Sequence, residues 1–200
     1  MVKLFKIILA PPSINFMNKN IPSILALVIC MIIPLISNAQ LKVGVNAGVA
    51  FPTGDLGAFS QVGYGAGISA EYLLLDKKFG IGASANFTTF SFRYIPQAGS
   101  TTLAPLALLA RYYISTGSVK PFVGVDFGIY YVKISDYYGN YGSKLNPGIA
   151  PIGGFAIKLT EQVDLNLAAK YNVVFSSTFA EASTFTFLGL QAGTAITFGK

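Results

Sequence analysis

Histidine and tryptophan are absent from the sequence of 200 residues, and cysteine occurs once, at Cys30. Histidine is the usual general base at neutral pH, so its absence excludes enzymes that depend on a histidine base. A single cysteine excludes both a disulfide within the chain and a cysteine-ligated metal site. We therefore expect no enzymatic activity, no catalytic residue, no metal site and no cofactor.

Charge is scarce as well. Charged residues make up 11% of the chain, against roughly 25% in a typical soluble domain, whereas apolar residues make up 52%. This shortage predicts that much of the surface does not face water. The net charge of +6 comes partly from Lys3, Lys6 and Lys19, and the rest of the chain contains no dense basic run. We therefore expect no nucleic-acid partner.

The N-terminal segment has the layout of an export signal. A short basic stretch begins at Met17, an apolar stretch covers residues 21–36, and the small residues of a cleavage site occupy 37–39. The apolar stretch is shorter than the roughly 20 residues that a membrane-spanning helix needs, which disfavours the alternative of an uncleaved anchor. Residues 1–39 are therefore predicted to be a signal peptide, with Met17 as an alternative start, and residues 40–200 to be the exported domain.

After Gln40 the dominant pattern is an alternation of period two. Leu41, Val43 and Val45 alternate with small or polar residues, and side chains at this spacing point to opposite faces of a strand. The same alternation predicts eight strands, over residues 41–51, 64–74, 79–88, 102–114, 121–131, 148–159, 163–173 and 188–198.

The predicted connections alternate in length. The short ones are residues 76–78, 115–119 and 160–162, and the longer ones are residues 52–63, 93–101, 133–147 and 174–183. Short turns at one end and long loops at the other are typical of outer-membrane barrels, in which the long loops face the outside of the cell. The predicted fold is therefore all-β, an up-and-down antiparallel transmembrane β-barrel of about eight strands.

The placement of charge distinguishes a membrane barrel from a soluble one. All the central charges fall on the small and polar face of the strands: Lys42, Glu71, Arg111, Asp126, Lys158, Asp164 and Lys170. As an outer wall, this face would solvate a soluble barrel poorly, whereas as a lumen lining its opposite charges can pair. The alternative is a soluble lipid-binding barrel with the apolar face inside. The pattern favours the membrane barrel, with outer-membrane lipid as its surroundings.

Several segments carry a resemblance to a known family. Residues 120–125 (Lys-Pro-Phe-Val-Gly-Val), residues 170–172 (Lys-Tyr-Asn) and the closing strand up to Phe198 resemble the outer-membrane β-barrel domain family, also described as porin-family or OmpA-like barrels. The resemblance covers about residues 40–200. It implies location in the cell outer membrane and recognition of the C-terminal strand by the barrel-assembly machinery. Enzymes of this fold class rely on a catalytic histidine, which this chain lacks.

The predicted role is structural or surface-interacting. The charges named above, together with aromatic side chains, would plug the lumen of so narrow a barrel. The tyrosine-rich stretch of the longest loop is the candidate contact for an extracellular ligand, through Asp136, Tyr137, Tyr138 and Tyr141. The alternative is a narrow porin-like channel for ions or small solutes, in which the lumen charges set selectivity.

Overall fold

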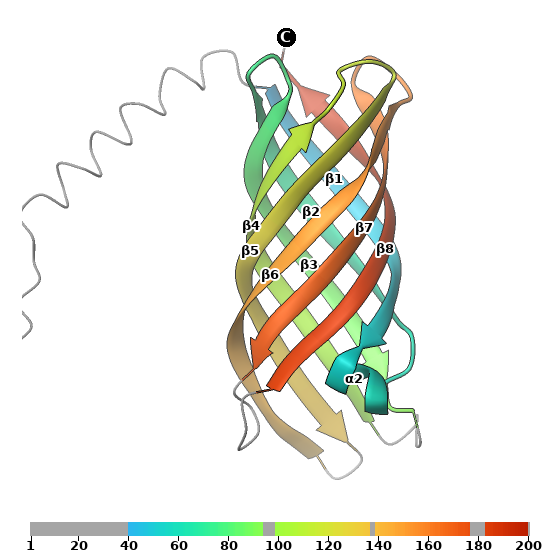
Figure 1. The fold of residues 1–200 in the computed structure, drawn as a ribbon, viewed down its shortest axis with the longest axis vertical. Coiled ribbons are helices and arrows are strands. Elements are labelled where there is room, and N and C mark those ends of the chain that lie inside the picture. The colour runs from blue at the N-terminus through green and yellow to red at the C-terminus, as the bar shows by residue number, and fades with distance from the viewer. Residues whose placement is uncertain (1–39, 94–98, 137–138, 177–182, 200) are drawn as a thin grey trace, which may run out of the picture. The chain divides into compact units, whose positions relative to one another are not determined.

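The computed structural model describes residues 40–93, 99–136, 139–176 and 183–199, so the predicted export segment 1–39 lies outside the described residues. The described chain forms a closed barrel in which each strand pairs with its neighbours in sequence and the first pairs with the last (Figure 1). Its elements are β1 (Gln40–Thr53), α2 (Gly54–Phe59), β2 (Gly63–Leu74), β3 (Phe79–Ser91), β4 (Gly99–Tyr113), β5 (Val119–Asp136), β6 (Gly139–Lys158), β7 (Val163–Ser176) and β8 (Ser183–Phe198). The predicted antiparallel barrel of eight strands is confirmed.

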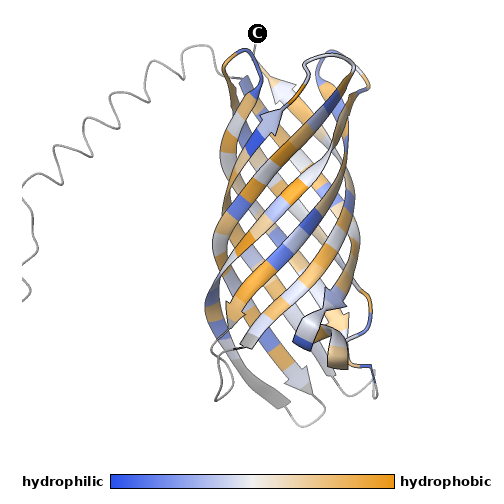
Figure 2. Cartoon of the chain, viewed as in Figure 1, coloured by the Kyte–Doolittle hydropathy of each residue, from blue (hydrophilic) through white to orange (hydrophobic). Residues whose placement is uncertain are grey.

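The period-two alternation separates the two faces of the barrel wall. Leu108 points outward and is 70% exposed, whereas its neighbour Leu109 points into the lumen and is 3% exposed. Apolar and polar residues alternate along the strands in Figure 2. The exposed outer face is a band of large apolar side chains that includes Val45, Ile68, Phe127 and Phe155. No helix in the described ranges is long and apolar enough to span a membrane.

The two ends of the barrel differ. One end, here called the turn rim, carries the connections 75–78, 114–118 and 159–162. The opposite end, here called the loop rim, carries α2 and the connections 54–62, 92–98, 137–138 and 177–182 (Figure 1).

The strands extend farther toward the loop rim than the sequence predicts. Most of the predicted loop 133–147 belongs to β5 and β6, which pair from Ile129–Pro147 out to Asp136–Gly139. The predicted loop 52–63 contains α2, whose Leu56 is fully buried. Alternation identifies a strand only where one face must be apolar, so it fades where the sheet leaves the apolar band while backbone pairing continues.

Proline interrupts two of the ladders. Pro105 of β4 pairs with Tyr130 of β5, but the β3–β4 register passes from Ala85–Leu106 to Thr88–Leu103 without a pair at this proline. The β6–β7 register has a similar gap at Pro151. Proline has no backbone N–H to donate, so these positions interrupt the pairing on one side only.

The glycines of the inner wall lie beneath bulky side chains from neighbouring strands. A Cβ atom added at Gly63 would lie 2.7 Å from the Phe90 ring, and one added at Gly148 would lie 2.5 Å from the Tyr130 ring. A Cβ atom at Gly80 would meet the carboxylate of Glu71. Glycine at these positions therefore lets large side chains lie close against the wall.

Candidate functional site

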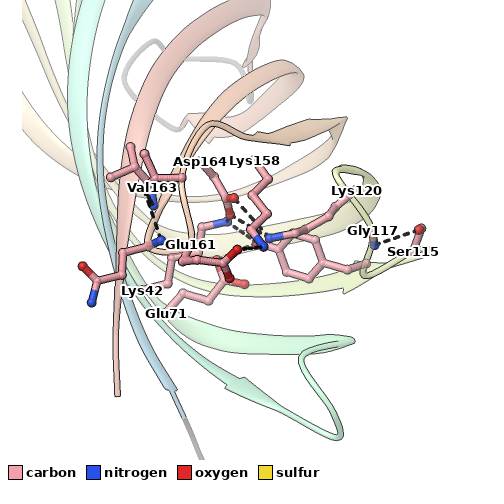
Figure 3. Close-up of polar contacts among 12 residues, drawn as sticks. Lys42, Glu71, Ser115, Gly117, Lys120, Lys158, Glu161, Val163 and Asp164 are labelled. Carbon is pink, nitrogen blue, oxygen red and sulfur yellow. Dashed lines mark hydrogen bonds and ion pairs between the residues drawn. The ribbon is translucent and has the colours of Figure 1, made fainter. Parts of the chain in front are cut away.

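The lumen contains ion pairs that join strands which are not adjacent in the barrel wall. Near the turn rim, Nζ of Lys42 on β1 lies 3.0 Å from Oδ2 of Asp164 on β7. Nζ of Lys120 on β5 lies 3.1 Å from Oδ1 of the same carboxylate. One carboxylate thus serves two ammonium groups that come from different strands (Figure 3).

A second group adjoins the first, because Glu71 of β2 pairs with Lys42 of β1. Nη1 of Arg111 lies 3.3 Å from Oε2 of Glu71, and the hydroxyl of Tyr113 donates to the same oxygen at 3.2 Å. The guanidinium carbon of Arg111 lies 5.4 Å from the centre of the Phe122 ring, within the range of a cation–π contact. The side chains of Arg111 and Glu71 are only 12% and 2% exposed, so each compensates the charge of the other.

The third ion pair lies near the middle of the lumen. Nζ of Lys170 on β7 lies 2.5 Å from Oδ2 of Asp126 on β5, and the two side chains are 4% and 1% exposed. The hydroxyl of Ser84 on β3 donates to the same carboxylate oxygen at 3.3 Å. Strands β3, β5 and β7 are therefore linked through one buried carboxylate.

Lys158 lies at the turn rim, at the edge of this network. Its Nζ lies 2.8 Å from Oε1 of Glu161, whose side chain is 89% exposed. The hydrogen bond and the positive charge of Lys158 lower the pKa of the Glu161 carboxyl. An ion pair this exposed to water contributes little to stability.

Apolar and aromatic side chains form a buried cluster inside the barrel toward the loop rim. Leu56 of α2 enters this cluster, and the rings of Phe90 and Phe187 meet edge to face with centres 5.3 Å apart. The hydroxyl of Tyr130 donates to the Asn172 side chain at 3.0 Å. The cluster is formed by Ala50, Leu56, Phe90, Leu103, Tyr130, Val132, Val174, Phe185 and Phe187.

The cavities inside the described barrel are unequal. A cavity of about 110 Å³ lies at the turn rim, between Lys42, Lys120 and Asp164. A cavity of about 30 Å³ lies deeper, beside Arg111, and another of about 20 Å³ lies beside Phe187. The two inner cavities have room for about one or two water molecules each.

The structure thus places six of the predicted lumen residues in three buried ion-pair groups and the seventh, Lys158, at the rim. Tyr113 was predicted as a bulky lumen side chain, whereas Lys120 was not predicted. The signal for Lys120 was present in the sequence, because it stands an even number of residues before Asp126 on the same strand and so faces the same side. Alternation assigns each residue to a face but not to a partner, because partners come from strands distant in sequence.

The tyrosine-rich contact predicted at the loop rim is only partly described. Tyr137 and Tyr138 lie outside the described residues, between β5 and β6. Asp136 is the last residue of β5, and Tyr141 lies near the beginning of β6. The outermost pair between the two strands is Asp136–Gly139. The backbone therefore places this stretch at the tip of a long hairpin.

Comparisons with known proteins agree with this architecture. The family model described as "outer membrane protein beta-barrel domain" matches residues 23–198. Neisserial surface protein A is 20% identical, with 81% of this chain and 98% of that chain covered and a TM-score of 0.61. OprG from Pseudomonas aeruginosa is 16% identical, with 81% and 96% covered and a TM-score of 0.51.

A third similar structure is Ail, the attachment invasion locus protein of Yersinia pestis, solved in complex with the heparin analogue sucrose octasulfate. It is 14% identical, with 80% of this chain and 97% of that chain covered and a TM-score of 0.51. No curated protein matches the chain. At these identities the solved structures support the fold alone.

Proposed function

The chain belongs to the family of outer membrane protein β-barrel domains and lies in the outer membrane, and from this premise we propose that it is a structural barrel with a closed lumen that displays its loop rim to the outside of the cell. The observation that supports the proposal is the set of side chains buried inside the barrel. Ion pairs link strands that are not adjacent in the wall in the turn-rim half, and an apolar cluster lies in the loop-rim half. Eight strands enclose a space that side chains can fill.

The small size of the inner cavities supports a closed lumen. Cavities of about 30 and 20 Å³ hold isolated water molecules and do not amount to an aqueous path. The glycines of the wall do not widen the lumen, because rings such as those of Phe90 and Tyr130 lie over them. A role in structure or surface contact therefore fits these residues better than conduction.

The first test is electrical. We expect the protein, purified from outer membranes and inserted into a planar bilayer, to give no steady single-channel current, because no continuous water-filled path supports ion flow. Insertion is verified independently by the heat-dependent mobility of the folded barrel in gel electrophoresis. A steady current that changes in selectivity in Asp126→Asn or Arg111→Gln would contradict the closed lumen and favour the channel alternative.

The surface role is assigned to the β5–β6 hairpin, residues 133–147. The β6–β7 pairing begins at Gly148–Val174, whereas the β5–β6 pairing continues to Asp136–Gly139. The hairpin therefore projects beyond β7 on one side, whereas on the other side β4 stays paired with β5 as far as Gly99–Asp136 (lower end of Figure 1). It carries an exposed apolar side chain, Leu145, at 66% exposure. A projecting hairpin with tyrosine and glycine at its tip is an adaptable contact surface.

A shortened hairpin tests this assignment. Replacing residues 134–142 by Asn-Gly preserves the Lys133–Ser143 pair and supplies a two-residue turn that suits a β-hairpin. We expect outer-membrane vesicles with the unaltered protein to bind immobilised heparin, because the similar barrel Ail was solved with a heparin analogue. Vesicles with the shortened hairpin should lose this binding while the folded barrel is retained.

The matched control shortens a different loop. Replacing residues 177–182 by Asn-Gly preserves the Ser176–Ser183 pair between β7 and β8, and binding should survive in this variant. Equal binding of heparin by the hairpin-shortened and unaltered vesicles, or no binding of heparin by either, would count against the hairpin as the contact surface.

The closing strand β8 is assigned the role of recognition during barrel assembly. Phe198 ends β8 with its ring on the outer face, 52% exposed, and it pairs with Leu41 of β1. An outward aromatic side chain at the end of the last strand suits recognition by the barrel-assembly machinery. We include this machinery and the surrounding outer-membrane lipid among the partners of the protein.

A further inference from the structure

The cavity at the turn rim is positively charged and faces the end of the barrel opposite to the displayed hairpin. Its volume is about 110 Å³, several times that of the inner cavities. Lysines outnumber carboxylates among the ionisable side chains that line it, which are Lys42, Lys77, Lys120, Lys158, Glu161 and Asp164. These lysines come from β1, β5, β6 and the 75–78 turn, so the closed barrel brings together charges that are distant in sequence.

The lysine ammonium groups in this cavity leave hydrogen-bonding capacity unused. Each lysine ammonium carries three donors. The Lys42 ammonium contacts Asp164 at 3.0 Å and the Tyr113 hydroxyl at 3.5 Å. The Lys120 ammonium contacts the two oxygens of the same carboxylate, at 3.1 and 3.2 Å. Since one carboxylate is shared by two ammonium groups, a positive charge remains uncompensated at this point.

Two more lysines at the outer side of the cavity increase its excess of positive charge. Lys158 faces the cavity from β6, and its partner Glu161 is largely in water (Figure 3). Lys77 lies at the cavity edge with no ion pair to another described residue. The side-chain amide of Gln40 and the hydroxyl of Thr197 complete a lining of neutral donors.

We propose that this turn-rim cavity binds a phosphate group. Phosphate carries between one and two negative charges at neutral pH and offers several acceptor oxygens, which suits ammonium groups that converge from different directions. The cavity volume of about 110 Å³ exceeds what one water molecule needs and accommodates a tetrahedral anion. The phosphate can belong to a free ion or to a phospholipid headgroup, because the cavity opens at the rim of the barrel wall.

The test is a calorimetric titration of inorganic phosphate into the protein purified from outer membranes in a non-ionic detergent. We expect saturable binding by the unaltered protein. In the double variant Lys120→Gln, Lys158→Gln, binding should weaken roughly tenfold or more, because two charge-assisted contacts are lost. The variant Asp164→Asn should bind phosphate more tightly, because the carboxylate no longer competes for Lys42 and Lys120. Opposite effects of the two variants are not expected from a general loss of structure.

Controls separate this site from non-specific attraction. Lys133→Gln removes a positive charge near the loop rim and should leave phosphate affinity unchanged. Native mass spectrometry with added phosphatidylglycerol distinguishes the two phosphate sources. Lipid retained by the unaltered protein but not by the double variant assigns a headgroup, and phosphate binding without lipid retention assigns the free ion. No saturable binding of either probe, or equal weakening in Lys133→Gln, would overturn the proposal.

Discussion

Replacing Lys170 by methionine should lower the free energy of unfolding by about 3–5 kcal/mol, the usual cost of breaking a buried ion pair by removing one partner. The substitution leaves the Asp126 carboxylate inside the barrel with only the Ser84 hydroxyl at one of its oxygens. Its other oxygen, Oδ1, already lacks a hydrogen-bond partner among the described residues. Urea unfolding of the protein in lipid vesicles, followed by circular dichroism, measures the change.

Two further variants identify the cause of that loss. The double variant Lys170→Met, Asp126→Leu removes both charges and should recover most of the stability, because a buried pair replaced by apolar groups is often neutral. Lys158→Met, which breaks an exposed pair at the turn rim, should cost only about 0–1 kcal/mol. Equal losses in the single and double variants would show that packing around Lys170, and not an unpaired charge, sets the effect.

Replacing Leu108 by arginine should cost about 2–4 kcal/mol in a bilayer, the penalty for a positive charge on the lipid face near the membrane midplane. Leu108 points outward from β4 and is 70% exposed in the isolated barrel, so no protein side chain compensates the new charge. The stability is measured by urea unfolding in vesicles, as for the lumen variants.

The matched control is Leu159→Arg, in the 159–162 turn. Leu159 is exposed to a similar degree, 57%, but it lies at the membrane interface, where the same change should cost about 0–1 kcal/mol. Equal stability of the two arginine variants would contradict a lipid-facing outer wall and support the soluble lipid-binding barrel.

The sequence predicted the barrel because the membrane imposes a strict pattern on each strand. Every strand crosses an apolar layer, so its outward residues must be apolar at every second position, as at Leu106, Leu108 and Ala110. That constraint acts locally along the chain and can be read without knowledge of strand partners. It ends at the membrane surface, which is why the outer parts of β5 and β6 were predicted as a loop.

The lumen was predicted less completely, because its contacts are not local. Alternation places Lys42 and Asp164 on the inner face, but their meeting depends on the register of the whole barrel. Lys120 was missed because it stands at the beginning of a strand, beside Pro121, where alternation has only just begun. The burial of Leu56 depends on the short helix α2 at the loop rim. A period-two pattern indicates strands and therefore could not predict this helix.

The closure of the wall has a consequence for the order of events during assembly. The pairing of Leu41 with Phe198 joins the two ends of the described barrel. Contacts between segments so distant in the chain are slow to form, because a long loop must close before they do. Until β8 is in place, β1 has an unpaired edge, and an unpaired edge in lipid leaves backbone N–H and C=O groups without partners. A chain that stops before β8 therefore has no stable folded state within the membrane, because its first strand keeps an unpaired edge.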